Sequence, residues 1–158
     1  DTVNTPALLK YKWDFLDSLP KPQGLINDYE SLYTMDEERK LDSIIKRFKR
    51  TTGIEIVIIT FDSNCVSKEN FNSLTLRIAN TWHIGQKGKD NGILIGISKG
   101  HQIMRIENGY GIEKLITDKE TKEIIYTAFI PYFKKNSYYD GTFNGVLKLM
   151  DLLNTKLN

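Results

Sequence analysis

Two apolar runs on either side of a helical pattern constrain the fold of this chain more than any other feature. The run Ile54–Phe61 is rich in β-branched residues and the run Gly92–Ser98 is apolar, and both are typical of buried strands. Between them Ser67 can cap a helix whose inner stripe is Phe71, Leu74, Ile78 and Trp82. Strand, helix and strand in this order form a βαβ unit, so we predict parallel strands joined by a right-handed crossover.

Further helices are expected before and after this unit along the chain. Residues 34–37 form a capping box, and the helix that follows ends at Gly53. Two more helices are expected at about 118–129 and 138–153, with a break at Pro131 because proline removes a backbone donor. The pattern therefore predicts an α/β fold.

Composition limits the classes of function. A net charge of +2 on 158 residues fits one domain with a sizeable core and does not indicate nucleic-acid binding. Cys65 is the only cysteine, which excludes an intramolecular disulfide and a cysteine metal cluster. No apolar run approaches the roughly 18 residues of a membrane span. We expect residues 1–23 to form an extended leader, with Leu16 and Leu19 docked on a domain at 24–155.

Two glycine-dense loops, residues 85–92 and 105–113, are joined by an apolar hairpin. Lys99-Gly100 is expected to turn the chain into an antiparallel strand from Gln102 to Glu107. Glycine permits tight turns and close approach to a bound group, and both loops carry carboxylates. The hairpin would bring both loops to one rim of the sheet, where a small ion or substrate could bind.

The predicted hairpin register brings oxygen ligands together. A two-residue turn places Glu107 opposite Gly92, with Asp90 and Asn91 beside them, and cross-strand neighbours lie about 4.5–5.5 Å apart. A longer turn would shift the register by about one residue without separating the rims. Carboxylate and amide oxygens suit calcium and magnesium, whereas neither histidine has a partner at zinc spacing. Simple turn chemistry explains the same Asp-Asn-Gly sequence and stays open.

A second rim is the fallback site. Ligands of open α/β sheets usually bind at the carboxyl ends of parallel strands. Asp62 and His101 are expected at that end, which is the far end of the sheet from Asp90.

The loops, in this order and spacing, resemble those of the TPM domain family. The resemblance covers roughly residues 24–153 and is carried by Ile26–Tyr29, Thr52–Val57, Trp82–Gly92 and Arg105–Glu113. That family includes bacterial exported or membrane-anchored proteins and thylakoid-lumen proteins linked to photosystem repair. The resemblance implies a three-layer α/β/α sandwich around a small mixed sheet, in agreement with the elements above.

The resemblance also implies a divalent-cation site, most often described for calcium. Carried over position by position, the metal ligands are Asp28, Asp90, Asn91, Glu107, Glu113 and Asp118. Two positions depart from the family pattern. Ile116-Thr117 precedes Asp118 where relatives often have Leu-Pro, which affects the geometry at Asp118, and Asn108 stands where relatives often have valine, which makes the rim more polar.

Two functions follow from the resemblance. The first is a binding or accessory module that holds calcium, with magnesium as the alternative. The second is a metal-assisted acid phosphatase, in which Asp90 or Asp28 would act as nucleophile or base and Lys89 or Arg105 would hold phosphate. No phosphatase nucleophile motif of the type Asp-x-Asp or Cys-x5-Arg is present. Enzymatic activity therefore stays an open alternative.

Partners and compartment complete the expectations. We expect a monomer outside the cytoplasm, periplasmic or secreted, with a divalent cation and a membrane protein as partners and no nucleic acid. The chain begins at Asp1 rather than at methionine, which is consistent with a processed product.

Overall fold

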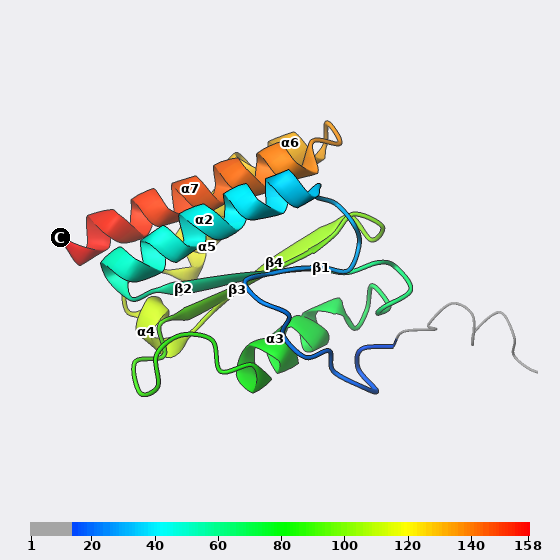
Figure 1. Cartoon of the computed structure of the whole chain (residues 1–158), viewed down its shortest axis with the longest axis horizontal. Coiled ribbons are helices and arrows are strands. Elements are labelled where there is room, and N and C mark those ends of the chain that lie inside the picture. The colour runs from blue at the N-terminus through cyan, green and yellow to red at the C-terminus, as the bar shows by residue number, and fades with distance from the viewer. Residues whose placement is uncertain (1–13) are drawn as a thin grey trace, which may run out of the picture.

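A four-stranded mixed sheet forms the middle layer of the protein, and helices cover both of its faces (Figure 1). The structure is a computed structural model that describes residues 14–158. The strands, in their order across the sheet, are β1 (Ile26–Asp28), β2 (Glu55–Thr60), β3 (Gly92–Ser98) and β4 (Ile103–Asn108). β1, β2 and β3 are parallel, and β4 is antiparallel to β3. The predicted α/β/α sandwich, βαβ unit and antiparallel hairpin are confirmed.

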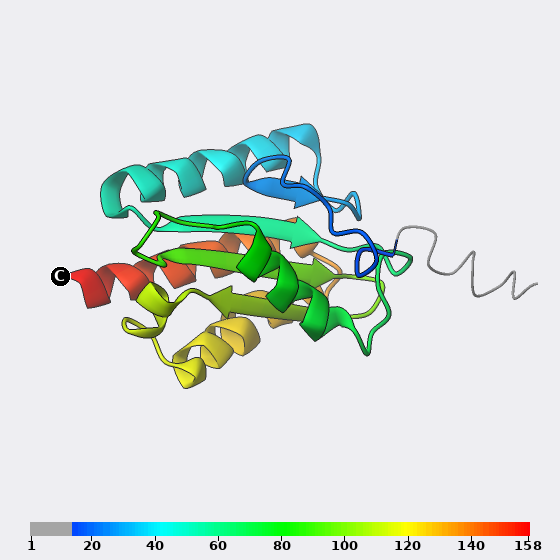
Figure 2. The same ribbon diagram turned by 90° about the horizontal axis from the view of Figure 1, so that it is seen from below.

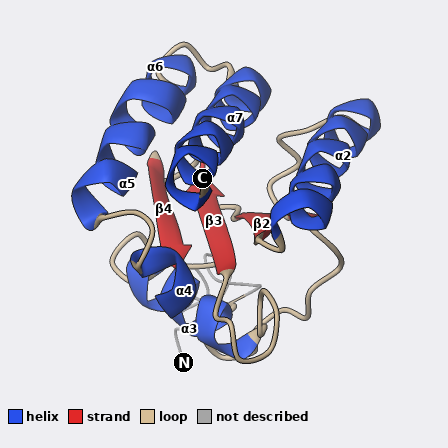
Figure 3. Cartoon of the chain, turned by 90° about the vertical axis from the view of Figure 1, so that its left-hand side faces the viewer, coloured by secondary structure: helices blue, strands red, loops and turns tan. Residues whose placement is uncertain are grey.

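The helices fall into two layers. Helices α2 (Met35–Thr52) and α7 (Tyr138–Leu157) lie on one face of the sheet, and α3 (Phe71–Thr81) lies on the other (Figures 1 and 3). The short helix α4 (Tyr110–Glu113) follows β4. The layer of α2 and α7 also contains a continuous helical segment made of α5 (Asp118–Ile124), the π-helix η1 (Ile125–Phe129) and α6 (Ile130–Phe133). None of the helices in the described residues combines the length and the apolar content needed to cross a membrane.

Each face of the sheet has its own apolar core. In β2 the side chains of Ile56 and Ile58 belong to the core under α2 and α7, whereas Val57 and Ile59 belong to the core under α3. All four are at most 4% exposed, so β2 is buried on both faces. This explains why its sequence is a continuous apolar run rather than an alternating one.

The predicted start and end of α2 are confirmed. The Thr34 hydroxyl accepts from the Glu37 amide at 3.1 Å, and the Glu37 carboxylate accepts from the Thr34 amide at 2.9 Å. Gly53 ends the helix with φ at 81°, a left-handed conformation that glycine adopts without strain. Helix α3 begins at Phe71, later than Ser67 suggested. The Ser67 hydroxyl accepts from the Asn70 amide at 3.2 Å, within a turn that precedes the helix.

The predicted helix break at Pro131 is wrong. Pro131 lies in the first turn of α6, inside the continuous α5–η1–α6 segment, and the chain leaves the helix only after Phe133. The preceding π-helix accommodates the proline: the Ile130 amide donates to the carbonyl of Ile125. The Asn144 side chain donates to the Ala128 carbonyl at 2.9 Å, which satisfies an acceptor in the same segment.

The hairpin turn is longer than predicted. Ser98 pairs with Ile103 rather than with His101, so four residues form the turn and Glu107 lies opposite Leu94 instead of Gly92. The Glu30 carboxylate fixes this turn because it accepts from the amides of Lys99 and Gly100 at 2.7 and 2.8 Å. The two-residue shift keeps every side chain of β4 on its predicted face.

The described part of the predicted leader packs against α3. The side chains of Leu16 and Leu19 join the core on that face, as expected. The Trp82 indole donates to the Pro20 carbonyl at 2.9 Å, and Arg77 donates to the Leu16 carbonyl at 3.0 Å. Residues 1–13 of the leader lie outside the described residues.

Candidate functional site

A groove of about 920 Å³ runs along the outer edge of β4. Its walls are α3 on one side and the α5–η1 segment on the other, and these helices flank β4 in Figures 2 and 3. The groove is lined by Asp90, Glu107, Glu113 and Asp118, four of the six predicted ligands, together with Arg105. Both glycine-dense loops therefore meet at one groove, as the sequence indicated.

The rim of the groove is held together by backbone contacts between the two loops. The Gly109 amide donates to the Gly92 carbonyl, and the Gly111 amide donates to the Asp90 carbonyl, both at 2.9 Å. A side chain on Gly111 would overlap the carbonyl oxygen of Lys89. Glycine is thus needed here for close approach of one backbone to another.

Glu107 has a partner inside the protein. Its carboxylate pairs with the Arg105 guanidinium at 2.7 Å and accepts from the Thr75 hydroxyl at 3.1 Å. The Glu107 side chain is only 11% exposed and faces α3. Arg105, which was predicted to hold phosphate, is thus paired with Glu107. Lys89, the other residue predicted to hold phosphate, does not line the groove.

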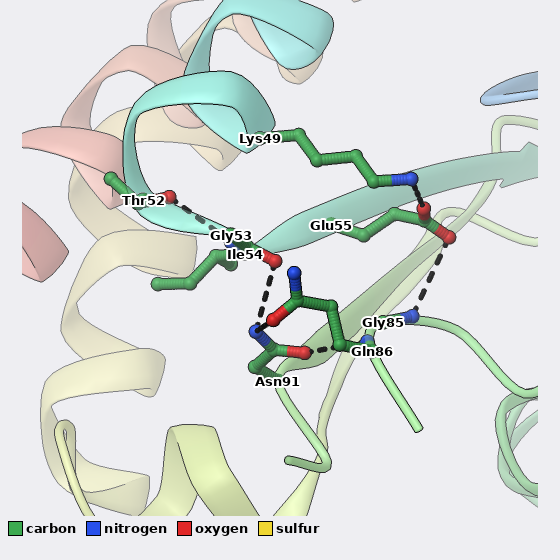
Figure 4. A network of polar contacts seen from close by, with 8 residues as sticks. All are labelled: Lys49, Thr52, Gly53, Ile54, Glu55, Gly85, Gln86 and Asn91. Carbon is green, nitrogen blue, oxygen red and sulfur yellow. Dashed lines mark hydrogen bonds and ion pairs between the residues drawn. The ribbon is translucent and has the colours of Figure 1, made fainter. Parts of the chain in front are cut away.

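Asn91 lies beside the rim but does not line the groove. Its side chain points toward Gly53 and Gln86 (Figure 4). Its amide oxygen accepts from the Gln86 backbone at 2.7 Å, and its amide nitrogen donates to the Gly53 carbonyl at 2.9 Å. Glu55 completes this network through an ion pair with Lys49 (Figure 4). Asn91 therefore fastens the loop to the end of α2 and the start of β2, a role that its sequence context did not reveal.

Asp28 lies at the opposite end of the sheet from Asp90. Asp28 pairs with Thr60 at the end of β2, whereas Gly92, next to the Asp90 loop, pairs with Glu55 at the start of β2. At about 3.3 Å per residue, Glu55 and Thr60 are roughly 16 Å apart along the strand. The predicted ligand set thus does not share one rim. The Asp28 carboxylate instead accepts from the amides of Leu32 and Tyr33 and from the Thr60 hydroxyl, at 3.0, 2.9 and 2.6 Å.

The other oxygen atoms at the rim, from carboxylates and an amide, are of the chemical type that hard cations such as calcium bind. No ion pair between residues 14 and 158 involves the exposed carboxylates of Asp90, Glu113 or Asp118. Asn108 lines the same groove: its side-chain nitrogen donates to the Thr121 hydroxyl at 3.0 Å, and its buried Oδ1 has no partner in the described part of the chain. In the described part of the chain, however, no three acidic, histidine or cysteine side chains are close enough to hold one ion together.

The fallback rim is occupied by internal bonds. The His101 ring lies 2.6 Å from the Val66 carbonyl, and the Asp62 carboxylate accepts from the Asn64 amide at 2.9 Å. Burial raises the pKa of Glu30, and burial raises the pKa of the Cys65 thiol to about 11, so that thiol stays protonated and unreactive at neutral pH. These groups stabilise the turns at this end, and the groove along β4 is the better candidate site.

The comparisons with known proteins agree with the fold described above. A family model described as the TPM domain matches residues 26–152. The N-terminal domain of a protein from P. gingivalis, solved by NMR, is 26% identical with a TM-score of 0.75, and the match covers 84% of this chain and 83% of that one. The BA42 protein from Bizionia argentinensis is 19% identical with a TM-score of 0.69, covering 81% and 86%.

A further structure has the same fold. The N-terminal domain of the cg2496 protein from Corynebacterium glutamicum is 13% identical with a TM-score of 0.59, and the match covers 87% of this chain and 83% of that one. The comparison with curated proteins finds no match.

Proposed function

The chain belongs to the TPM domain family, and on that premise we propose that it is a calcium-binding module that acts outside the cytoplasm. The observation that carries the proposal is the set of oxygen atoms at one end of the groove. Among residues 14–158, the carboxylates of Asp90, Glu113 and Asp118 have no ion-pair partner, and the buried Asn108 Oδ1 has no hydrogen-bond donor. Like charges near one another favour a bound cation, and oxygen donors suit calcium, with magnesium as the alternative.

The spread of these donors supports a site of modest affinity. Because no three of the acidic side chains in residues 14–158 are within reach of one ion, binding must draw the two glycine-dense loops together or recruit water as further ligand. Calcium sites of extracellular modules bind at about 10⁻⁴–10⁻³ M. This range favours a location outside the cytoplasm, where the module would engage a membrane protein as its partner.

Calcium titration followed by amide NMR tests the proposal. We expect the amides of residues 89–91 and 108–118 to shift, with half-saturation at about 10⁻⁴–10⁻³ M calcium. Asp90→Asn removes one charged ligand and is expected to weaken calcium binding about tenfold. Magnesium is expected to bind more weakly because it tolerates less deviation from octahedral geometry.

The matched control is Asp62→Asn, which removes one carboxylate at the far end of the sheet. It is expected to leave the calcium affinity unchanged. Amides of the two loops that stay still at calcium concentrations well above about 10⁻³ M would refute the proposed site.

The metal-assisted phosphatase is the second candidate, and one observation favours it. Arg105 lines the groove together with the acidic rim, and its ion pair with Glu107 is made through Nε. A cation at the rim would polarise a phosphoryl oxygen, and the free guanidinium nitrogens of Arg105 would orient the phosphate. Turnover of an aryl phosphate that Asp90→Asn abolishes and Asp62→Asn preserves would support this activity; equal rates in wild type and both variants would exclude it.

A further inference from the structure

The outer edge of β4 lacks a strand partner in the described sheet, where β4 is the last strand. The bond from the Gly109 amide to the Gly92 carbonyl fixes which groups point outward. In an antiparallel pair the residues alternate, so Ile103, Arg105 and Glu107 direct their backbone groups at β3. The amides and carbonyls of Met104, Ile106 and Asn108 point away from the sheet. They form a row of donors and acceptors that another strand can pair with.

The groove described above follows this same row. Every residue from Ile103 to Gly109 lines it, so the edge lies along the floor of the groove rather than on an open surface. Natural edge strands are usually blunted by unpaired charge, proline or bulges. Here the two charged side chains of β4, Arg105 and Glu107, face α3 and neutralise one another. The edge therefore keeps its capacity to pair.

The walls of the groove carry exposed apolar side chains. Leu76 on α3, Tyr110 on α4 and Tyr126 on η1 are 50%, 73% and 68% exposed, and all three line the groove. Tyr126 belongs to the π-helix, a conformation that occurs frequently at functional sites. These side chains can cover the alternating side chains of an added strand on both faces.

The shape of the walls favours one extended strand over a second sheet. In Figures 2 and 3 the α5–η1 segment lies outside β4, over the space where the next strand would run. A second copy paired through β4 would bring its own α5–η1 segment into that same space. A single peptide strand needs only the groove.

The charges of the groove indicate at which end a bound strand begins and in which direction it runs. Asp90, Glu113 and Asp118 gather at the end of the groove where β4 finishes, and Lys122 is the lysine among the lining residues. A strand antiparallel to β4 begins at this acidic end, and antiparallel pairing is the more stable arrangement. We propose that the groove binds an extended peptide segment of a partner protein by antiparallel strand addition to β4, with a basic residue at the start of the segment and apolar residues after it. This proposal goes beyond the cation site and does not depend on it.

The test uses a short probe peptide, Lys-Thr-Val-Thr-Val-Thr, acetylated and amidated at its ends, with EDTA present to keep calcium away. With its lysine beside Asn108, both valines lie opposite Ile106 and Met104 and direct their amides at β4. We expect chemical-shift changes along residues 103–109 and about tenfold slower hydrogen exchange at the amides of Met104, Ile106 and Asn108.

N-methylation of the peptide provides the matched control without altering the protein. Methylation of both valine nitrogens blocks the bonds to β4 and is expected to weaken binding at least about tenfold. Methylation of the second and third threonine nitrogens, which point away from β4, is expected to leave the affinity nearly unchanged. Equal loss from both modifications, or shifts elsewhere on the protein, would overturn strand addition.

Charge and competing occupants are tested with the same signals. A peptide with glutamate in place of the lysine is expected to bind about threefold more weakly. The double variant Glu113→Gln, Asp118→Asn is expected to lose this preference for lysine. The control variant Asp151→Asn on α7 is expected to keep it. Equal affinity of the wild type for the two peptides would overturn the proposed preference for a basic residue.

Protection of the β4 amides from hydrogen exchange without peptide would also overturn the proposal. If this protection rises with protein concentration, a second copy covers the edge; if the protection is independent of concentration, another part of the same chain covers the edge.

Discussion

Replacing Gly111 with alanine is expected to lower the free energy of unfolding by about 3 kcal/mol and the melting temperature by roughly 6–12 °C. Alanine ordinarily stabilises a helix relative to glycine by about 1 kcal/mol, and Gly111 lies in α4. Here the added Cβ would overlap the Lys89 carbonyl oxygen and lie 3.0 Å from that of Asp90. The loops must separate, which breaks the bond from the Gly111 amide to the Asp90 carbonyl. Thermal unfolding followed by circular dichroism measures the loss.

Gly88→Ala is the matched control in the same rim. A Cβ on Gly88 meets no atom within 4 Å, but φ is 81° there, so only the left-handed backbone conformation opposes alanine. That conformation costs about 1–2 kcal/mol, less than a collision between two backbones. If Gly111→Ala were as stable as the wild type, the loop at Lys89 would have to move without cost, and the rim would not be the rigid end of the groove.

Most of the fold was predictable because its signals are local. The β-branched run of β2 and the capping box at Thr34 depend only on neighbouring residues, and both predictions are confirmed. Strand β1 was missed because it has only three residues, Ile26–Asp28, too few for a pattern to repeat. Helix α4 was missed for the same reason, since a four-residue helix that contains glycine looks like a turn.

The placement of the candidate site residues was predicted in part, and the differences come from contacts between distant residues. The hairpin register depends on Glu30, which accepts from the amides of the turn 69 and 70 residues later. No pattern within the hairpin reports that contact. The orientation of Asn91 likewise depends on the Gly53 carbonyl, 38 residues earlier. Grouping acidic residues by the hairpin therefore brought four of them to one groove, but it did not determine which of the predicted residues face that groove.

Asp28 makes the sharpest case, because the same residue has a different role in the two interpretations. The resemblance implied a metal ligand, whereas the structure gives its carboxylate three hydrogen-bond donors: the amides of Leu32 and Tyr33 and the hydroxyl of Thr60. Thr60 is fully buried. These bonds join the end of β1 to the end of β2 and to the segment that leads into α2. Asp28 is thus expected to matter for stability rather than for cation binding.

Asp28→Ala is expected to lower the free energy of unfolding by about 3 kcal/mol, because three donors lose a charged acceptor and bonds to charged groups contribute about 1.5–3 kcal/mol each without being additive. Asp28→Asn keeps one acceptor oxygen and is expected to lose about half as much. Asp62→Ala, which removes an acceptor of one exposed amide, is expected to cost less than about 1 kcal/mol. Urea unfolding measures all three.

The calcium affinity of the folded Asp28→Asn variant separates the two roles. Since Asp28 and Asp90 lie at opposite ends of β2, Asp28→Asn is expected to bind calcium as the wild type does, whereas Asp90→Asn binds it about tenfold more weakly. The comparison is made at low denaturant and low temperature, where both variants are folded. A loss of calcium binding in Asp28→Asn without a loss of stability would return Asp28 to the ligand set. It would also move the cation site to the carboxyl ends of the parallel strands, away from the groove along β4.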